Sequence, residues 1–497
     1  MPEIRHVAAL GPDHPRGPEF TADLRDGEDG FLAELLWGDP VHVLDDSSDP
    51  VRVRAREREG FLPADRLTDE GLLEIYVIDV GQGDGVLFRT PDDRWHLVDA
   101  GRPNEDQMTG KGAANFIRWK FLDDLGREEV ELESVILSHP DYDHYGGLLD
   151  LFRGEVSRPD RTFEVSVGTF FHPGLGRFRD EPQLGARTRA EVEAFPRGYH
   201  RIRRRGTFIT ELLDGREDFA DPARPFTASF GELAGLVAEV PDEVRRLTHR
   251  DEFLPGYGPG GSGPEIRVLG PILEEPEPGT PALRRMVSDS VTRNGQSVVL
   301  RIDHGDARLL LTGDLNAKSQ RLLLSYHPPG AFRVDMAKAC HHGSEDIDLG
   351  FTEATGARAT VISSGDNEDY AHPRPLVMGA SGRYGREAVT PGGDRLPPLL
   401  YSTELARSVK LSYAESVQIR RERFWPIRYA VADTEIRPER GPDWHLPLEH
   451  LPVSTDLVYG LVNVRTDGEH VLCATMEEQG HEFDVKVFRA GREPGDG

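Results

Sequence analysis

The stretch "SHPDYDHYGG", residues 138–147, constrains this chain most, because it places two imidazoles and two carboxylates within six positions. It follows "ESVIL", a short apolar run typical of a buried β-strand. Such groups, crowded at a strand end, repel one another or lose hydration at a cost unless a cation lies among them. The stretch therefore indicates a cation site that includes His139, Asp141, Asp143 and His144.

Further candidate ligands occur downstream, each after an apolar run. "ARLLLTGD" ends in Asp314, "VDMAKACHH" ends in His341 and His342, and "ATVISSGDNEDYAHP" contains His372. Residues 73–101 add three strand-like runs separated by the turn-forming segments "GQGDG" and "PDD". In a layered α/β domain such strand ends converge on one edge, so we expect these side chains to form a single polar site.

This set of residues is suited to two divalent ions, which together lower the pKa of a shared water from about 15.7 toward 7. His139 and Asp141 are expected to bind one ion, and Asp143 and His144 the other. Asp314 is suited to bridge them, because a carboxylate offers two oxygens. One of the adjacent histidines, His341 or His342, would complete the second ion site, and the sequence leaves open which.

Six motifs in order carry a family resemblance: "DVGQGDG", "LVDAG", "SHPDYDHYGG", "LTGD", "KACHHGS" and "SSGDNEDYAHP". "HPDYDH" fits the H-x-[HD]-x-D-H signature of the metallo-β-lactamase superfamily. Together the motifs resemble the soluble hydrolase domain of the ComEC competence-protein family, over about residues 73–380 with an insertion at about 152–264. The resemblance implies an α/β fold, the αββα sandwich, with a binuclear metal centre at one edge.

Two departures from the wider superfamily affect the expected metal. Asp141 stands where most members have a second histidine, as it does in ComEC-like chains. Asn294 and Ser297 stand in the stretch where many members supply a further histidine. An oxygen-rich first site favours harder ions, so Mn²⁺ and Mg²⁺ join Zn²⁺ as candidates.

The resemblance and the charge pattern also suggest catalytic and substrate contacts. Lys338 matches a lysine of the ComEC-like pattern and is expected to contact a phosphate, beside Asp143 and His372 as catalytic candidates. For His372, substrate contact and a structural hydrogen bond are equally expected. The basic run "RGYHRIRRR" is a candidate guide for phosphate. The substrate-binding candidates are Asn294, Ser297, Ser344, Arg201, Arg203, Arg204 and Arg205.

Domain boundaries are predicted from changes in residue composition and patterning along the 497 residues. Residues 1–29 are rich in Pro, Gly and acid and are expected to be poorly ordered. Residues 30–70, with alternating valines and "GFLPADRL", resemble a bacterial SH3-like β-barrel, and a plain β-rich cap on the main domain is an equal alternative. Residues 71–385 form the expected hydrolase domain, and residues 386–497 a β-rich C-terminal extension packed on it.

Composition limits the cell compartment and the partners. The formal charge of −28 argues against a generally basic surface that coats nucleic acid, but metal ions and a local patch can still hold phosphate. Two cysteines cannot build a disulfide framework, and no apolar run of about 18 residues or secretory leader is evident. We therefore expect a cytoplasmic protein without a membrane segment.

The sequence as a whole predicts a metal-dependent hydrolase, a phosphodiesterase or nuclease that acts on nucleic acid or a nucleotide. Hydrolysis of another ester, a thioester or a lactam is the alternative within enzymes, because this fold hosts many reactions. A regulatory protein that binds a protein partner through the SH3-like module is the alternative outside enzymes.

Overall fold

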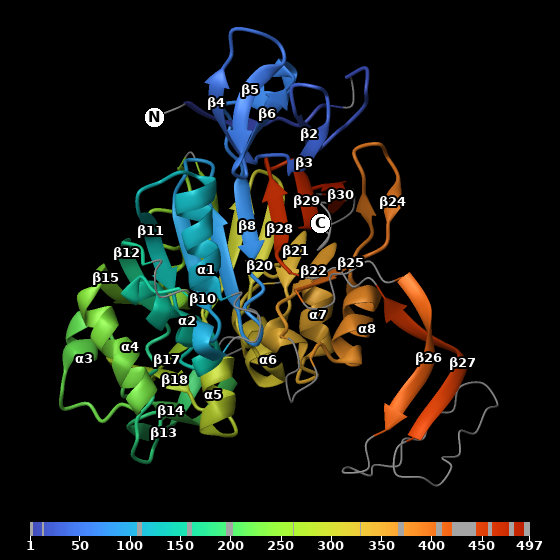
Figure 1. Ribbon diagram of the computed structural model, residues 1–497. Helices are drawn as coiled ribbons and strands as arrows, with labels where there is room; N and C mark the ends of the chain where they lie inside the picture. Colours follow the sequence, from blue (N-terminus) through green and yellow to red (C-terminus); the bar gives the residue numbers. More distant parts are fainter. Residues whose placement is uncertain are drawn as a thin grey trace.

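The computed structural model describes residues 3–11, 14–106, 112–156, 162–194, 202–261, 263–328, 330–365, 372–403, 410–419, 444–455, 460–476 and 482–491. Within these ranges, two sheets form the centre of the molecule (Figure 1). The first sheet has nine strands, in the order β15-β12-β11-β10-β9-β8-β28-β29-β30. The second has six, in the order β16-β19-β20-β21-β22-β25.

The strands of the first sheet are β8 (Leu73–Val77), β9 (Gly85–Arg89), β10 (Trp95–Ala100), β11 (Val130–Ile136), β12 (Val165–His172), β15 (Pro241–Arg246), β28 (Val462–Thr466), β29 (His470–Met476) and β30 (Phe483–Arg489). The strands of the second sheet are β16 (Glu265–Gly270), β19 (Val299–His304), β20 (Ala307–Leu311), β21 (Met336–Lys338), β22 (Ala359–Ile362) and β25 (Leu399–Ser402).

The two sheets pack face to face, because both have an apolar inner surface. Ile75 and Phe88 of the first sheet share one buried cluster with Leu300, Leu309 and Met336 of the second. Strands whose two faces are both covered read as continuous apolar runs, as "LLEIYV" and "ARLLL" do. This shared cluster is the centre of the sandwich.

Helices cover the outer face of each sheet. A second apolar cluster joins the first sheet to α1 (Ala113–Arg118), which continues as a π-helical turn over Trp119–Asp124, to α2 (Tyr142–Arg153) and to α4 (Ala228–Glu239). A third joins the second sheet to α6 (Ala317–Tyr326) and α7 (Leu349–Thr355), and α8 (Pro375–Tyr384) lies against α7. The layers confirm the predicted α/β sandwich, with helices outside two sheets (Figure 1).

The direction of the strands explains where polar residues gather. β10, β11, β12 and β15 run parallel in the first sheet, and β20, β21, β22 and β25 run parallel in the second. Every predicted ligand lies just after the carboxyl end of one of these strands. Ligand sites of open α/β sheets lie at such ends, and the sandwich brings the two sets of ends together.

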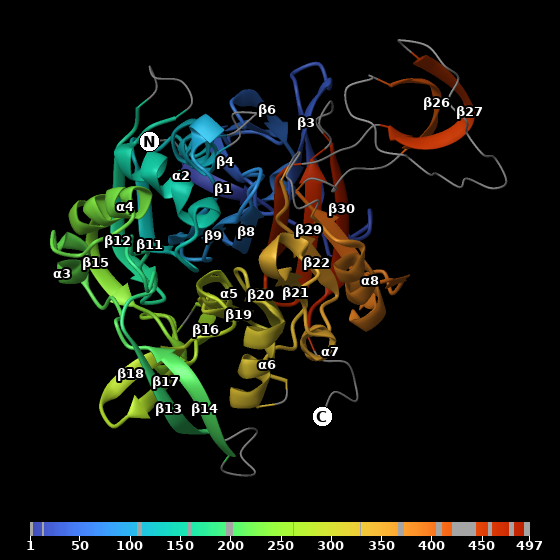
Figure 2. The same cartoon turned by 90° about the horizontal axis from the view of Figure 1, so that it is seen from below.

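The predicted insertion at 152–264 contributes more than a loop. It carries β12, α3 (Arg216–Ala220), α4 and β15, so part of it belongs to the first sheet and to its helical layer. It also supplies β13 (Arg187–Ala194) and β14 (Ile202–Ile209), which join β18 (Thr280–Arg284) and β17 (Leu273–Glu277) in a four-stranded sheet. Figure 2 shows the four strands together, and in Figure 1 they lie beside α5 (Asp289–Gly295), whose Asp289 pairs with Arg187 of β13.

The N-terminal sheet corrects one boundary. It has seven strands among the described residues: β1 (Glu3–Val7), β2 (Thr21–Arg25), β3 (Phe31–Leu36), β4 (Pro40–Asp45), β5 (Val51–Ala55), β6 (Arg58–Leu62) and β7 (Leu67–Thr68). The expectation of poor order over residues 1–29 is wrong for β1 and β2. Their apolar side chains, Val7 and Leu24, are fully buried in the barrel core, which outweighs the polar composition around them.

The C-terminal segment does not simply pack on the hydrolase. β28 pairs antiparallel with β8, so β28–β30 extend the first sheet itself, and β25 pairs with β22 in the second. The remaining described elements after residue 385 are β23 (Ala388–Val389), β24 (Arg395–Leu396) and the pair β26 (Lys410–Ile419) and β27 (Trp444–Thr455). No helix in the described part of the chain has the length and apolarity to cross a bilayer.

Candidate metal centre

The predicted ligands meet where the two sheets end. His139 follows β11, Asp143 and His144 lie in the first turn of α2, and Asp314 follows β20. His342 follows β21, on the opposite sheet. Ligand atoms lie within 4.8 Å of one another in His139, His144 and Asp314, and again in Asp143, His144 and His342.

Asp314 is at the centre of this group and is buried, with 2% of its surface exposed. Its Oδ2 faces the Nε2 atoms of four histidines, at 3.2 Å for His342, 3.3 Å for His144, 3.6 Å for His341 and 3.9 Å for His139. The Asp314 carboxylate therefore lies at the centre of the predicted ligand set.

Several of these ligand atoms lack a hydrogen-bond partner. The Nε2 atoms of His139, His144 and His342 and the Oδ1 of Asp314 are buried and unpaired within the part of the chain that the structure describes. Buried polar atoms in folded proteins are nearly always satisfied, so a cluster of orphans that all face one point needs an explanation. Imidazole nitrogens and a carboxylate oxygen converging on one point fit divalent metal ions.

The electrostatics of the cluster also favour a cation. Burial opposes ionisation of Asp314, but His342 and His144 outweigh it and hold its pKa well below the usual range. Burial likewise opposes charge on His342, but Asp314 and Asp84 raise its pKa to about 10. The carboxylates thus create a field that attracts positive charge, which a divalent ion supplies in place of protons.

Two buried carboxylates orient the histidines from behind. Asp99 accepts from the Ser138 backbone N–H at 2.7 Å and lies 2.8 Å from Nδ1 of His144. Asp84 lies 3.1 Å from Nδ1 of His342. A carboxylate on Nδ1 fixes the ring so that Nε2 faces the ion, and it raises the basicity of the ligand. These contacts place Asp84 and Asp99 behind the loop that carries the candidate ligands.

Lys338 occupies a different place from the one expected. Its side chain is 1% exposed, and its ammonium donates to the Asp84 carboxylate and, at 3.3 Å, to the Gly313 carbonyl oxygen. The predicted contact with a substrate phosphate does not agree with this burial. The geometry instead places Lys338 behind Asp84, which in turn holds His342.

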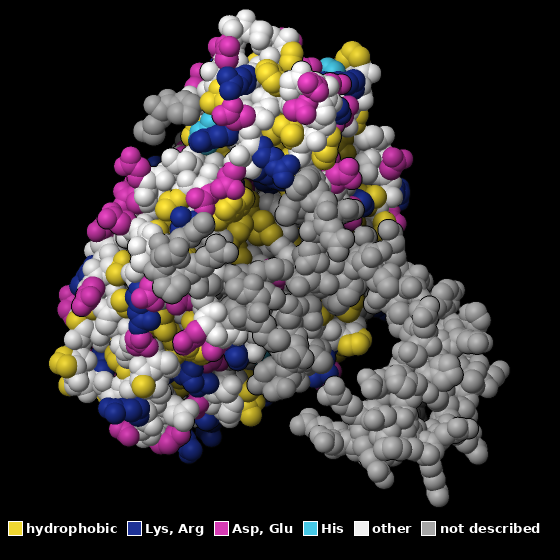
Figure 3. Space-filling model, in the orientation of Figure 1, with side chains coloured by type: hydrophobic (Ala, Val, Ile, Leu, Met, Phe, Trp, Pro, Cys, Tyr) yellow, Lys and Arg dark blue, Asp and Glu magenta, His cyan; other side chains and the backbone are white. Residues whose placement is uncertain are grey.

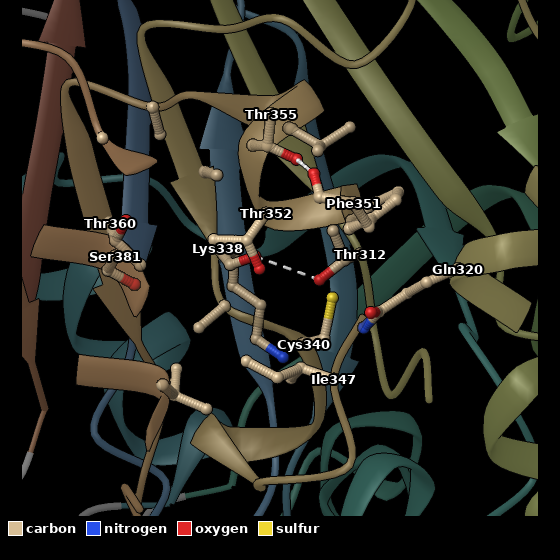
Figure 4. Close-up of a pocket in the computed structure, with 16 residues that line it drawn as sticks. Thr312, Gln320, Lys338, Cys340, Ile347, Phe351, Thr352, Thr355, Thr360 and Ser381 are labelled. Carbon is tan, nitrogen blue, oxygen red and sulfur yellow. Dashed lines mark hydrogen bonds between the residues drawn. The ribbon is translucent and has the colours of Figure 1, made fainter. Parts of the chain in front are cut away.

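A small cavity of about 60 Å³ lies on this buried side of the site. Figure 4 shows Lys338 and Cys340 side by side at its wall, with Thr312 and Gln320 beyond. Burial raises the pKa of the Cys340 thiol to about 11. A protonated thiol in a closed cavity is a poor nucleophile, which agrees with its interpretation as a packing residue.

The structure distinguishes the two adjacent histidines. His342 is 3% exposed and faces Asp143 and His144. The His341 side chain is 28% exposed, and its Nε2 lies 3.2 Å from the Asn294 amide, toward the Asp141 side. Both residues have positive φ, 49° and 54°, an uncommon conformation for histidine that aims two neighbouring rings at one carboxylate.

Polar groups from α5 and the insertion surround Asp141. Arg293 donates to its Oδ1 at 2.5 Å, and Arg177 lies 3.9 Å from the same oxygen. When the Asn294 amide is oriented to satisfy both of its polar atoms, its nitrogen donates to Oδ2 of Asp141 at 2.9 Å. Ser297 lies 3.4 Å from Nδ1 of His139 and accepts from the Asp314 backbone N–H at 3.1 Å. Asn294 and Ser297 therefore contact the ligands.

Sequence reasoning missed three side chains at this site: Arg293, Arg177 and Gln82, the last of which donates to Asp143 at 3.3 Å. Arg293 and Gln82 stand inside motifs that the sequence already offered, "TRNGQS" and "GQGDG". Arg177 lies in the insertion, where no local pattern distinguishes it from a surface arginine.

Two glycines allow the close packing of the metal loop. A Cβ on Gly83 would lie 1.9 Å from the Asp143 carbonyl oxygen, and one on Gly147 would lie 2.1 Å from the Ala100 carbonyl oxygen. Gly147 lies within α2, where the missing side chain lets the helix approach β10.

The other predicted contacts are at the margin of the site or outside it. The His372 ring lies 6.0 Å from the His341 ring. The Ser344 hydroxyl accepts from the Asp346 backbone N–H. Arg205 is 90% exposed and 3.5 Å from Glu191 on the neighbouring strand β13. Arg201 and the side chains of Arg203 and Arg204 lie outside the described residues.

Comparisons with known proteins agree with the site. The model of the metallo-beta-lactamase superfamily matches residues 78–222, which include the HxDxDH motif. The chain is 27% identical over 145 residues to ComE operon protein 3 of Bacillus subtilis (strain 168), covering 29% of this chain and 17% of that protein. It is 34% identical over 99 residues to competence protein ComA of Neisseria gonorrhoeae, covering 20% and 14%. The chain thus spans less than a fifth of the length of these relatives.

Solved structures show a more distant likeness. Tm1679, a metal-dependent hydrolase of the beta-lactamase superfamily, aligns over 65% of this chain and 98% of its own, with 14% identity and a TM-score of 0.31. A diphosphatase from the PhnP family aligns over 58% and 85%, with 11% identity and a TM-score of 0.26. Similarity at this level supports no inference about activity. What the comparisons show is a match of residues 78–222 to the metallo-beta-lactamase superfamily model, and this stretch carries the HxDxDH motif of the candidate site.

Proposed function

We propose that this chain is a metal-dependent phosphodiesterase that acts on nucleic acid or a nucleotide. The observation that carries the proposal is the set of orphaned, buried ligand atoms around Asp314. His139, Asp141, His341 and Asp314 would hold one divalent ion, and Asp143, His144, His342 and Asp314 the other. Such ions would supply an activated water and Lewis-acid stabilisation of phosphoryl oxygens.

The residues of the chain prepare this chemistry. Arg293 and Arg177 offset the charge of Asp141 and hold its carboxylate in one orientation. Gln82 fixes Oδ2 of Asp143, and Lys338 fixes Asp84 behind His342. Ligands held by packing and hydrogen bonds keep their geometry during the reaction, which is the condition for electrostatic stabilisation of a transition state.

His372 is the candidate proton donor to the leaving oxygen. Its ring lies 6.0 Å from His341 and 6.5 Å from His342, at the margin of the cluster. A group that protonates a leaving oxygen must lie beside the metal ligands without being one of them, and His372 meets that condition. Replacing it should lower turnover of substrates with poor leaving groups more than of those with good ones.

The metal identity proposed here is Mn²⁺ or Zn²⁺, with Mg²⁺ as a further candidate. Both proposed sites have two imidazoles and two carboxylates, which suits Zn²⁺ and Mn²⁺. The carboxylate of Asp141 makes the first site richer in oxygen than a histidine at that position would, which favours Mn²⁺ or Mg²⁺.

The test is a substrate panel on the metal-loaded protein: bis(p-nitrophenyl) phosphate, single-stranded DNA, RNA, cyclic dinucleotides and a chromogenic lactam. Asp314→Asn should lower the hydrolysis rate of every phosphodiester by at least about 10³-fold, because it removes the charge of the proposed bridging carboxylate. Asp303→Asn, a change of the same size on β19, should stay within about threefold of the parent, a difference of about 0.7 kcal/mol. Lactam turnover without phosphodiester turnover would overturn the proposal.

A further inference from the structure

A basic hollow of about 500 Å³ lies beside the candidate metal centre. Its walls are the segment Arg284–Val287, which follows β18, and the side chains of Lys318, Arg321 and Leu322 on α6. Figure 2 shows α5 and α6 side by side at this end of the molecule, and the two helices are in contact. We call this hollow the α6 groove.

Both walls of the α6 groove continue into the metal centre. Arg284–Val287 leads into α5, whose Arg293 donates to Asp141. Met286 packs against Gly295, where a Cβ would lie 2.4 Å from its sulfur. Lys318 follows Asp314 by four residues, so their Cα atoms are within about 14 Å even along an extended chain. The wall formed by α6 therefore begins within about 14 Å of the candidate bridging residue Asp314.

The groove has four cationic side chains and no acidic one in its lining. Arg284 pairs with Glu274, and Arg285 pairs with Asp289, so these two side chains form a fixed wall of the groove. Arg321 is 58% exposed and lies 2.9 Å from Asp348.

Lys318 is exposed and makes no ion pair with any residue that the structure describes. It lies three positions before Arg321 on α6, so both cations face the same side of the helix. In a chain of charge −28, a site that presents two adjacent cations is suited to an anion.

The groove is also partly apolar. Val287 is 61% exposed, which is unusual for a large aliphatic side chain, and Met286 and Leu322 line the groove beside it. A positively charged groove that follows the backbone is one feature of sites for single-stranded nucleic acid. The volume is that of a small-ligand cleft, which accommodates one strand rather than a duplex.

We propose that the α6 groove binds the phosphodiester backbone of a single-stranded nucleic acid whose scissile bond lies at the metal centre. This inference rests on the proposed phosphodiesterase function and adds the substrate class and its binding site. It places the phosphate contacts on Lys318 and Arg321 rather than on the basic run "RGYHRIRRR" that the sequence suggested.

The experiment compares Lys318→Gln/Arg321→Gln with the parent, on a single-stranded oligodeoxynucleotide, an oligoribonucleotide of the same sequence, and bis(p-nitrophenyl) phosphate. The matched control is Arg395→Gln/Lys486→Gln, which removes the same charge from exposed residues on β24 and β30, away from α6 (Figure 1). KM and kcat are measured at several salt concentrations, and circular dichroism and metal content are measured for each variant.

The groove variant should raise KM for one or both oligonucleotides about tenfold at low salt. The slope of log KM against log salt should fall by about 0.7 for each phosphate that the variant no longer neutralises. Turnover of the small diester, which does not reach the groove, should change less than twofold in either variant. The oligonucleotide that responds identifies whether DNA or RNA is the ligand.

Two failures are distinguishable. If the parent cleaves oligonucleotides and the groove variant has the same KM and salt slope, the groove assignment is wrong while the phosphodiesterase stands. If the parent hydrolyses no phosphodiester, the proposed function is wrong. In that case, fluorescence anisotropy of a labelled oligonucleotide tests binding in the groove separately from catalysis. Equal affinity of the parent and the groove variant would overturn the groove assignment.

Discussion

Buried ionic groups behind the histidines determine how well the candidate site is preorganised. His342 lies between the carboxylates of Asp314 and Asp84, and Asp84 is itself neutralised by Lys338. Burial disfavours the Lys338 ammonium, but Asp84 and Asp314 outweigh it and raise its pKa, so the lysine stays charged. The lysine therefore acts on the metal through two intermediate side chains and is a positioning residue.

Lys338→Met should weaken metal binding. Without the ammonium, Asp84 is left buried and unpaired, and its hold on His342 changes. Removal of such outer partners typically costs about 10–100-fold in metal affinity or activity. The measurement is activity as a function of Mn²⁺ and Zn²⁺ concentration, with thermal unfolding recorded in parallel.

Lys120→Met is the matched control for this change. Lys120 is also a buried lysine paired with an aspartate, Asp124 at 2.6 Å, but it lies in the helical layer away from the ligands. It should lower thermal stability and leave the metal concentration for half-maximal activity unchanged. An equal shift in both variants would show that Lys338 serves stability alone.

At the scale of elements, the two ends of the chain complete the hydrolase. β28 pairs with β8, and Arg465 on β28 reaches the N-terminal barrel, where it donates to Asp39 at 2.6 Å and to the Trp37 carbonyl oxygen at 2.6 Å. Leu36 and Trp37 of the barrel pack on Leu472 of β29. The N-terminal sheet is thus joined to the first sheet by buried contacts.

Arg465→Met should lower the free energy of unfolding by about 3–5 kcal/mol, because it leaves Asp39 buried with one cation fewer. Urea denaturation followed by circular dichroism measures the change. Arg395→Met, which removes an exposed partner of Glu387, should cost less than about 1 kcal/mol. Equal costs for the two variants would mean that the Arg465 contacts do not join the barrel to the sheet.

The sequence predicted the elements that carry motifs, because each motif contains its own strand-forming run and turn-forming residues. The strand ends at His139, Asp314 and His342 are of this kind. The barrel strands β1 and β2 were missed, because their buried positions, Val7 and Leu24, are few among polar residues. The pairing of β28 with β8 was not predictable, because nothing local encodes a contact between residues almost 400 positions apart.

The candidate site also has a part that the sequence predicts and a part that depends on the fold. Residue type and spacing predicted which side chains gather around Asp314, since a metal requires particular donor atoms. The orientation of Lys338 toward Asp84 and the choice between His341 and His342 depend on backbone conformation, including two consecutive residues with positive φ. Such conformations are stabilised by the surrounding fold and leave no signal in the residues themselves.

At the scale of the whole molecule, acidic and basic side chains intermingle over the visible face of the barrel and the helical layer (Figure 3). An excess of acid spread in this way repels polyanions generally and confines phosphate binding to places where cations gather. The candidate metal centre and the α6 groove are adjacent places of that kind. The net charge of −28 is therefore compatible with a nucleic-acid substrate that binds at one site.

The proposed function requires that the cluster around Asp314 hold two divalent ions and that hydrolysis depend on them. The decisive experiment is elemental analysis of the purified protein, combined with bis(p-nitrophenyl) phosphate hydrolysis before chelation, after chelation and after metal is restored. We expect two ions per chain, activity lost on chelation and recovered with Mn²⁺ or Zn²⁺, and neither ions nor recovery in Asp314→Asn. Full activity in the metal-free parent, or two tightly bound ions in Asp314→Asn, would contradict this mechanism.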